Sequence, residues 1–179
     1  MCCFRGLAGV FDVNLGGILN LNKPAGVTSR DVVNVVQRLA GRKIRVGHAG
    51  TLDPLARGVL VVPVGPATRL IEYVQQMPKT YRAEFQFGVQ SDTEDMDGNV
   101  TQLESPPVPS EEQLRAALPR FMGKILQRPP TYSALRVNGK RAYDLARKGK
   151  QVELAPREIE VYQILLDEYD YPKLRLTIE

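Results

Sequence analysis

The chain has 179 residues, of which 43% are hydrophobic and 25% are charged, and this composition excludes disordered, collagen-like and membrane-spanning proteins. A formal net charge of +4 and a pI of about 9.1 favour an anionic partner such as nucleic acid, although this signal is weak. The two cysteines are the neighbours Cys2 and Cys3, and there is one histidine, so the sequence indicates neither a disulfide scaffold nor a metal site.

The apolar N-terminal stretch, residues 1–21, does not match a signal peptide. Arg5 and Asp12 interrupt it, and no small-residue cleavage site follows a clean apolar run. No apolar run in the chain approaches the ~18 residues that a membrane-spanning helix needs. The sequence therefore predicts a cytoplasmic protein.

The first elements are a short strand and a helix. Gly17–Leu21 reads as a strand, which the Asn-Lys-Pro-Ala-Gly run at 22–26 ends. Thr28 and Asp31 have the spacing of a capping box, with an aspartate in the place of the usual glutamate or glutamine. Apolar residues then recur at helical spacing up to Gly41, a natural C-terminal stop. They are Val32, Val35, Val36 and Leu39.

Two strands follow in the middle of the chain. Gly58–Val64 is a continuous apolar run, which is typical of a buried strand. Thr80–Phe87 alternates strictly between apolar and polar residues, so one face of that strand carries Tyr81 and Phe85.

The remaining elements are two helices and two strands. Ser110–Phe121 predicts an amphipathic helix that begins with a capping box of Ser110 and Gln113 and turns Phe121 inward. The other three predicted elements are a basic helix and two final strands: Lys140–Lys148, Glu158–Glu168 and Lys173–Glu179.

These elements predict a mixed α/β (α+β) domain in which helices flank a largely antiparallel sheet. The alternation of the last strand continues to Glu179 without a turn, so we expect the sheet to continue beyond this residue. A basic cluster in the second half is either a solvated face or a binding surface for phosphates. It comprises Arg136, Lys140, Arg141, Arg147, Lys148 and Lys150.

The segment GHAGTLDPLARGVL, residues 47–60, is a glycine-rich loop that holds one acid and leads into the buried strand. Pro54 keeps Asp53 out of the helical region of backbone space. A carboxylate between a polar loop and an apolar strand requires a partner or a function. From these residues alone, an aspartate that caps the turn is the favoured interpretation.

Four segments together resemble the TruB family of tRNA pseudouridine synthases. GHAGTLDPLARGVL is similar to the catalytic motif of that family, and ILNLNKPAGVTSRDVV is similar to its first strand, lysine-proline turn and helix. KTYRAEFQFGVQSDTEDMDG resembles its tyrosine-bearing strand, and PPTYSALRVNGKRAYDLARKG its basic insertion. The matches run in order from about Ile18 to Glu179, so they are more specific than any single motif.

The resemblance implies a pseudouridine synthase fold with a basic RNA-binding insertion at residues 124–151. Residues 1–179 would be the catalytic domain, incomplete at its C-terminus and without the family's PUA domain. The implied reaction is isomerisation of uridine-55 to pseudouridine in the T loop of tRNA, with the base flipped out of the loop.

The resemblance also implies individual roles. Asp53 matches the catalytic aspartate, Tyr81 the tyrosine that packs against the target base, and His48 a histidine near the flipped nucleotides. Lys23 matches a lysine that supports the active-site loop, and the arginine partner of the aspartate would lie beyond Glu179. The implied substrate-binding residues are therefore Lys23, His48, Tyr81, Arg136, Lys140 and Arg141.

Isomerisation exchanges neither atoms nor electrons, so the resemblance implies no cofactor and no metal. The expected partner is the T arm of tRNA, with no membrane, no obligatory protein partner and a monomeric state. Two alternatives stay open. One is an RNA-guided synthase of a ribonucleoprotein, which shares a similar aspartate loop. The other is a non-catalytic RNA-binding or RNA-folding module.

Overall fold

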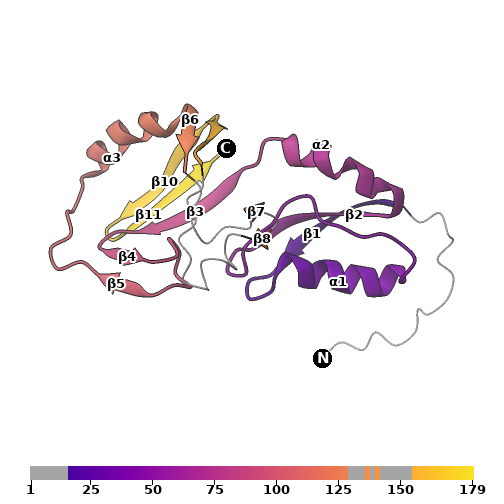
Figure 1. Cartoon of the computed structure of the whole chain (residues 1–179). Coiled ribbons are helices and arrows are strands. Elements are labelled where there is room, and N and C mark those ends of the chain that lie inside the picture. The colour runs from indigo at the N-terminus through magenta and orange to yellow at the C-terminus, as the bar shows by residue number, and fades with distance from the viewer. Residues whose placement is uncertain (1–15, 129–135, 138–139, 142–154) are drawn as a thin grey trace. The chain divides into compact units, whose positions relative to one another are not determined.

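The computed structural model describes residues 16–128, 136–137, 140–141 and 155–179. The chain divides into an N-terminal unit, Met1–Met77, and a C-terminal unit, Pro78–Glu179, which are described one at a time. Figure 1 labels their elements. Within the described residues, no helix has the length and the apolar character needed to cross a membrane.

The N-terminal unit contains a two-stranded sheet and a long helix. Its elements are β1 Gly17–Lys23, α1 Ser29–Ala40, β2 Gly58–Val64, the 3₁₀ helix η1 Gly65–Leu70 and α2 Ile71–Gln76. β1 and β2 are antiparallel, and their register runs from Gly17 opposite Val64 to Lys23 opposite Gly58. The predicted strand at β1 is therefore confirmed and extends through Lys23, and the predicted strand at β2 is confirmed with its bounds.

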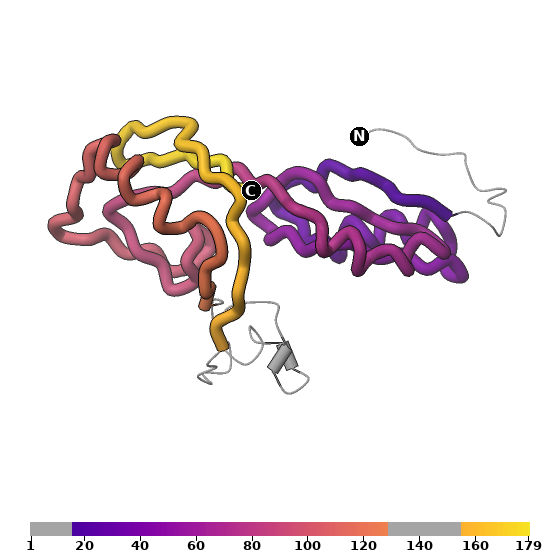
Figure 2. The backbone as a smooth tube through the Cα atoms, turned by 90° about the horizontal axis from the view of Figure 1, so that it is seen from above, coloured from indigo at the N-terminus to yellow at the C-terminus, as the bar shows by residue number. Residues whose placement is uncertain are grey.

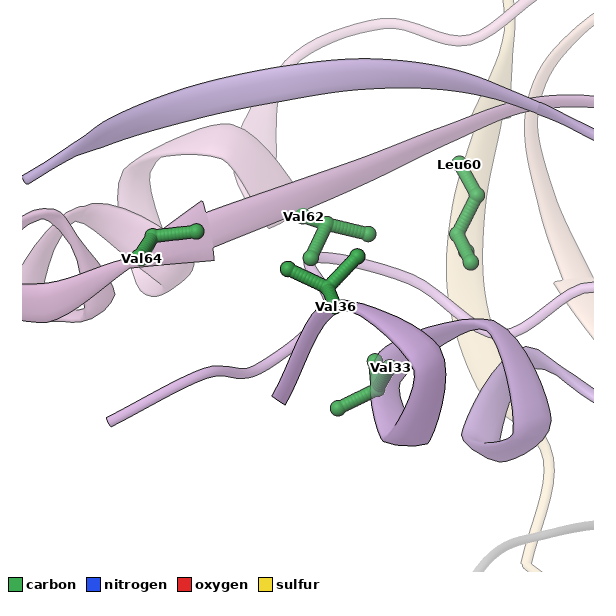
Figure 3. Packing of buried hydrophobic residues seen from close by; sticks show 5 residues of the cluster. All are labelled: Val33, Val36, Leu60, Val62 and Val64. Atoms are coloured by element: carbon green, nitrogen blue, oxygen red, sulfur yellow. The ribbon is translucent and has the colours of Figure 1, made fainter. Parts of the chain in front are cut away.

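The core of this unit lies between α1 and β2 (Figure 3). Leu60, Val62 and Val64 alternate along β2 and share one face of the strand. Val33 and Val36 are three residues apart on α1, so they share one face of the helix. Full burial of such a side chain stabilises the fold by about 1.5–3 kcal/mol. This core thus fixes the helix against the strand that follows the Asp53 loop, which we define as residues 47–57.

Helix α1 begins and ends as its sequence predicts. The Thr28 side chain accepts a hydrogen bond from the Asp31 backbone at 3.1 Å, and the Asp31 carboxylate accepts one from the Thr28 backbone at 2.9 Å. The Thr28 hydroxyl also donates to the Asp31 carboxylate, and this bond, together with the one from the Thr28 backbone, holds the pKa of Asp31 below its usual value. Gly41 ends the helix with φ 89°, a conformation that glycine adopts without strain.

The C-terminal unit is built from short antiparallel pairs and one three-stranded sheet, and its backbone can be followed in Figure 2. The sheet has the order β10-β11-β3. The elements are β3 Tyr81–Gln86, β4 Val89–Ser91, β5 Val100–Gln102, α3 Glu111–Ala117, the 3₁₀ helix η2 Leu118–Phe121, β6 Gly123–Gln127, β7 Arg136–Val137, β8 Lys140–Arg141, β9 Arg157–Val161, β10 Ile164–Asp170 and β11 Lys173–Ile178.

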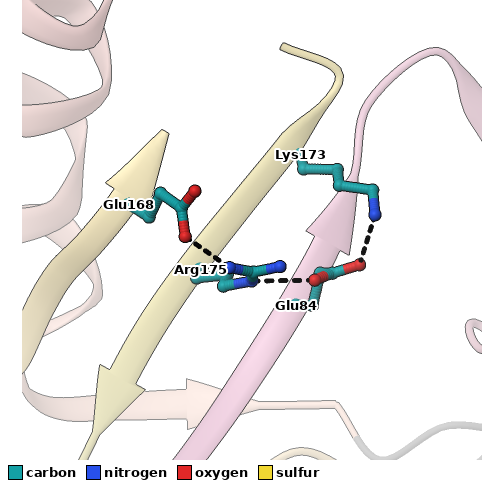
Figure 4. A network of polar contacts seen from close by, with 4 residues as sticks. All are labelled: Glu84, Glu168, Lys173 and Arg175. Atoms are coloured by element: carbon teal, nitrogen blue, oxygen red, sulfur yellow. Dashed lines mark hydrogen bonds and ion pairs between the residues drawn. The ribbon is translucent and has the colours of Figure 1, made fainter. Parts of the chain in front are cut away.

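One face of the three-stranded sheet carries a ladder of alternating charges (Figure 4). Arg175 on β11 donates to Glu84 on β3 at 2.9 Å and also pairs with Glu168 on β10. Lys173 lies 3.4 Å from the same Glu84 carboxylate. The hydrogen bond from Arg175, with the nearby Lys173 charge, lowers the pKa of Glu84. The opposite face is apolar, because Leu174 and Leu176 of β11 are buried there.

Two helix predictions need correction. The helix after Ser110 has the predicted capping box but ends at Ala117, and a 3₁₀ helix follows because Pro119 cannot donate to an α-helical bond. Phe121, predicted to face inward, is 57% exposed. The predicted helix at Lys140–Lys148 is wrong at its start, because β8 pairs with β7 as a strand. Asn138-Gly139 between them is a hairpin signal in the sequence. Residues 142–148 lie outside the described residues.

One strand prediction also needs correction. The single strand predicted at Glu158–Glu168 is divided into β9 and β10, with Tyr162 and Gln163 between them. The half-buried residues shift there from odd to even positions, Ile159 and Val161 before and Ile164 after, so the two parts cannot continue one face. The last predicted strand is confirmed as β11, Lys173–Ile178, which lies between β10 and β3.

Candidate active site

The Asp53 loop is held on its C-terminal side by the ammonium group of Lys23. The Lys23 side chain is fully buried at the end of β1 and donates to three carbonyl oxygens. The distances are 3.0 Å to Pro24, 2.7 Å to Val27 and 3.3 Å to Pro54. An ammonium group has three N–H donors, so the three carbonyls satisfy it. Of the three, Pro54 belongs to the loop and directly follows Asp53.

A second contact binds the same carbonyl. Gly26 donates its backbone N–H to Pro54 at 2.8 Å. The turn that presents this N–H requires φ 83° at Gly26, which a residue with a side chain rarely adopts. The lysine-proline turn of the sequence therefore positions the loop through both its lysine and its glycine.

On its N-terminal side the loop is held by Ser29, the first residue of α1. The Ser29 hydroxyl donates to the Leu52 carbonyl at 3.0 Å and accepts from the Leu52 N–H at 2.9 Å. Ser29 is 3% exposed, so these bonds lie away from water. No local sequence pattern predicts this contact, because the two residues are 23 positions apart and Ser29 lies between the two capping-box residues.

Together these contacts constrain three consecutive peptide groups around the aspartate. Ser29 holds the peptide between Leu52 and Asp53, and Lys23 with Gly26 holds the peptide after Pro54. The Asp53 carbonyl accepts the Ala56 N–H at 3.0 Å, and this bond holds the peptide that joins Asp53 to Pro54. Each peptide is planar, so fixing its carbonyl fixes the backbone direction at its ends.

The Asp53 side chain itself is exposed, and among the described residues it has no hydrogen-bond or ion-pair partner. The interpretation of Asp53 as a turn-capping aspartate is therefore not supported, because the bonds of this turn are made by backbone groups and by Lys23 and Ser29. A held backbone that presents a free carboxylate is an arrangement suited to chemistry on a ligand.

His48 lies in the same loop and is positioned by backbone pairing with β2. Its neighbours Gly47 and Ala49 donate to Pro63 and Val61 at 3.1 and 2.9 Å. His48 Nδ1 is 2.6 Å from the Gly50 carbonyl. A carbonyl oxygen can only accept, so this contact places a proton on Nδ1 and leaves Nε2 for another partner.

Tyr81 lies in the C-terminal unit, at the first position of β3. It faces Ile178 across the sheet and shares the apolar face with Phe85. Tyr81 is 51% exposed and Phe85 is 45% exposed. The ring is therefore anchored by a defined register and still has area available for a partner.

The β7–β8 pair, termed the basic hairpin, carries three basic residues of the insertion: Arg136, Lys140 and Arg141. Arg136 pairs with Arg141, and Val137 with Lys140, in the β7–β8 pair. Arg147, Lys148 and Lys150 lie outside the described residues. The structure thus joins Lys23 to the Asp53 loop through hydrogen bonds within one unit, and places Tyr81 and the basic hairpin in the other.

Comparisons with a family model and with individual proteins point to the same family. The TruB family pseudouridylate synthase N-terminal domain matches residues 37–179. A tRNA pseudouridine synthase B of Acaryochloris marina is 49% identical over 164 residues, which are 91% of this chain and 56% of that protein. The protein of the same name in Clostridium acetobutylicum is 44% identical over 165 residues, 92% of this chain and 56% of that protein. The chain spans little more than half the length of these relatives.

Solved structures support the same fold. A chain in the crystal structure of a Cbf5-Nop10-Gar1 complex superposes with a TM-score of 0.59 at 26% identity, covering 91% of this chain and 38% of that chain. A chain of the archaeal box H/ACA sRNP Nop10-Cbf5 complex gives 0.58 at 26%, covering 91% and 37%. These similarities confirm the predicted fold class. The chain belongs to the TruB family of pseudouridylate synthases, whose N-terminal domain it contains over residues 37–179.

Proposed function

We propose that the protein isomerises uridine-55 to pseudouridine in the T loop of tRNA, with Asp53 as the catalytic carboxylate. The observation that carries this proposal is the Asp53 loop: its backbone is held from both sides while the carboxylate stays accessible. The identity of 44–49% to proteins named tRNA pseudouridine synthase B supports the choice of tRNA as substrate.

The reaction breaks the N1–C1′ glycosidic bond, turns the uracil and joins C5 to C1′. C5 loses its proton when it bonds to C1′, and N1 gains a proton after the glycosidic bond breaks, so the product has the same atoms as the substrate. Asp53 acts either as a nucleophile or as a base that takes a sugar proton, and both routes need an accessible carboxylate. The uridine has to leave its loop to reach that carboxylate.

The other site residues are assigned to binding. The exposed ring of Tyr81 offers a face for stacking on the target base, which is worth ~1–3 kcal/mol per base. His48 keeps Nε2 available for a hydrogen bond to nearby nucleotides. Arg136, Lys140 and Arg141 would neutralise phosphates of the T arm.

An RNA-guided synthase is the second candidate, because the structures that superpose on this chain include a box H/ACA sRNP complex. The identity to those chains is 26%, against 49% to the tRNA pseudouridine synthase B of Acaryochloris marina. The higher identity favours direct recognition of tRNA.

The test is a pseudouridine assay on a T-arm stem-loop without guide RNA, with the protein expressed from its complete gene. We expect Asp53-dependent turnover, and a loss of at least about a thousand-fold in the Asp53→Asn variant, because removal of a reacting group costs at least this much. Its affinity for the stem-loop should stay within about two-fold, since phosphate contacts supply most of the affinity.

The matched control is Asp92→Asn. Asp92 accepts hydrogen bonds from the Asn99 backbone and side chain in the turn between β4 and β5, so it is an aspartate in a turn outside the Asp53 loop. This variant should keep full turnover. Turnover by Asp53→Asn at the parent rate would exclude the proposed role of Asp53, and turnover only with added guide RNA would favour the second candidate.

A further inference from the structure

Ser29 occupies an unusual place for the first residue of a helix. The first turn of a surface helix normally directs its polar side chains to water, but Ser29 is 3% exposed. The capping of α1 is performed by Thr28 and Asp31. The Ser29 hydroxyl is therefore not required by its own helix, and both of its hydrogen bonds go to Leu52.

One hydroxyl here satisfies both backbone groups of one distant residue. Its O–H donates to the Leu52 carbonyl at 3.0 Å, and its oxygen accepts the Leu52 N–H at 2.9 Å. The Leu52 carbonyl belongs to the same planar peptide as the Asp53 nitrogen. The orientation of the chain as it enters Asp53 is thus set by Ser29.

The position of this hydroxyl is itself rigid. Val33, one turn further along α1, is 1% exposed in the core against β2. A side chain at the first helical position therefore has little freedom to follow the loop, and the loop has to conform to the helix.

We propose that Ser29 is a positioning residue for the Asp53 carboxylate, a role that rests on the proposed isomerase function. Ser29 acts only through Leu52 and does not touch the substrate. Lys23 holds the other side of Asp53 through Pro54, so loss of Ser29 would loosen one side of the loop and leave the other attached. A displacement of about 1 Å at a reacting group can lower the rate about a hundred-fold.

The experiment compares Ser29→Ala, Ser29→Cys and Thr28→Ala in the protein expressed from its complete gene. Ser29→Cys keeps the volume of the side chain but is a poor hydrogen-bond partner, so it separates the hydrogen bonds from packing. Thr28→Ala weakens the start of the same helix without touching the loop, because the Thr28 hydroxyl bonds only to Asp31 among the described residues. It is therefore the matched control.

Rates on the T-arm stem-loop are normalised to the folded fraction. We expect kcat to fall about ten- to a hundred-fold in both Ser29 variants, with KM and RNA affinity within about two-fold, because the change affects a transition-state geometry. Thr28→Ala should keep the parent kcat while losing stability. Amide exchange at Leu52 should become faster in Ser29→Ala and stay slow in Thr28→Ala.

Two negative results are distinguishable. If the parent turns over and Asp53→Asn does not, yet Ser29→Ala keeps the parent kcat, the role of Ser29 is excluded and the proposed function stands. A KM increase with unchanged kcat would exclude it as well, since that pattern indicates binding. If the parent itself shows no Asp53-dependent turnover, the proposed function fails, and the positioning role of Ser29 fails with it.

Discussion

The polar groups that hold the Asp53 loop are buried, whereas those that tie together the sheet carrying Tyr81 lie in solvent. Lys23 and Ser29 are 0% and 3% exposed, and every acceptor they use is a backbone carbonyl. Glu84 and Arg175 are 43% and 49% exposed and pair with each other across strands. Both arrangements fix the direction of a backbone.

This contrast predicts which contacts in each unit are sensitive to substitution. Removal of a buried donor leaves its acceptors with neither a protein partner nor water, so the free energy of unfolding falls by a large amount. After removal of one partner of an exposed ion pair, water solvates the other partner, so the free energy of unfolding falls only slightly and in a salt-dependent way. We therefore expect single substitutions to damage the Asp53 loop far more than the sheet of Tyr81.

The largest effect on stability should come from Lys23→Met. Methionine keeps much of the volume but leaves the Pro24 and Val27 carbonyls without a donor, at a cost of roughly 3 kcal/mol. The control is Lys124→Met, because Lys124 pairs with Glu158 while its side chain is 67% exposed. That change should cost less than about 1 kcal/mol. Urea unfolding of both variants measures the contrast, and equal costs would contradict it.

The Asp53 loop also marks the limit of what sequence can predict. The apolar run at Gly58–Val64 and the capping pattern of Thr28 were sufficient to predict β2 and α1 on either side of it. The importance of Asp53 came from a resemblance, because an aspartate before a proline is common in turns. The bond between Ser29 and Leu52 joins positions 23 residues apart and follows from packing of α1 on β2, which has no local signal.

In the C-terminal unit, sequence patterns did not predict the features that depend on strand pairing. The alternation of Lys173–Ile178 predicts a strand, but its central place between β10 and β3 depends on partners distant in the chain. Lys140 and Arg141 suit a helix by composition and are held as a strand by β7. Local preference was overruled in this case by cross-strand contacts.

Tyr81→Leu tests whether the exposed ring of Tyr81 stacks on the target base. Leucine preserves apolar contact with Ile178 but cannot stack on a base, so activity per folded molecule should fall about ten- to a hundred-fold. Phe85→Leu is the matched control, because Phe85 is a half-exposed aromatic on the same face of β3. It should lower the melting temperature without lowering that activity. Equal activity losses in the two variants would assign Tyr81 to the sheet alone.

The basic hairpin should contribute to binding through charge. Lys140→Ala combined with Arg141→Ala should weaken RNA binding and reduce the slope of log K against log salt by roughly 1 to 2, because fewer counterions are released. Arg115→Ala removes an exposed arginine that pairs with Glu111 on α3, and it should leave the slope unchanged. Titrations of the T-arm stem-loop at several salt concentrations compare them. An unaltered slope in the double variant would identify the hairpin as a solvated surface.

The smallest effect should come from the charge ladder, and it should depend on pH. The pKa of Glu84 is lower in the folded protein than in the unfolded chain, because Arg175 and Lys173 favour the ionised carboxylate. Because the folded protein holds this proton less tightly than the unfolded chain, ionised Glu84 stabilises the fold. This stabilisation is fully present above the unfolded pKa of about 4.5 and is lost as pH falls through the folded pKa.

Glu84→Gln should therefore be slightly less stable than the parent at pH 7, and the two should converge as the pH falls below about 4.5. Glu104→Gln, a change at an exposed carboxylate outside the ladder, should show no such convergence. Thermal unfolding of the three proteins between neutral and acidic pH measures this, and a gap between Glu84→Gln and the parent that stays constant across that range would mean that the ladder does not stabilise the sheet through its charge.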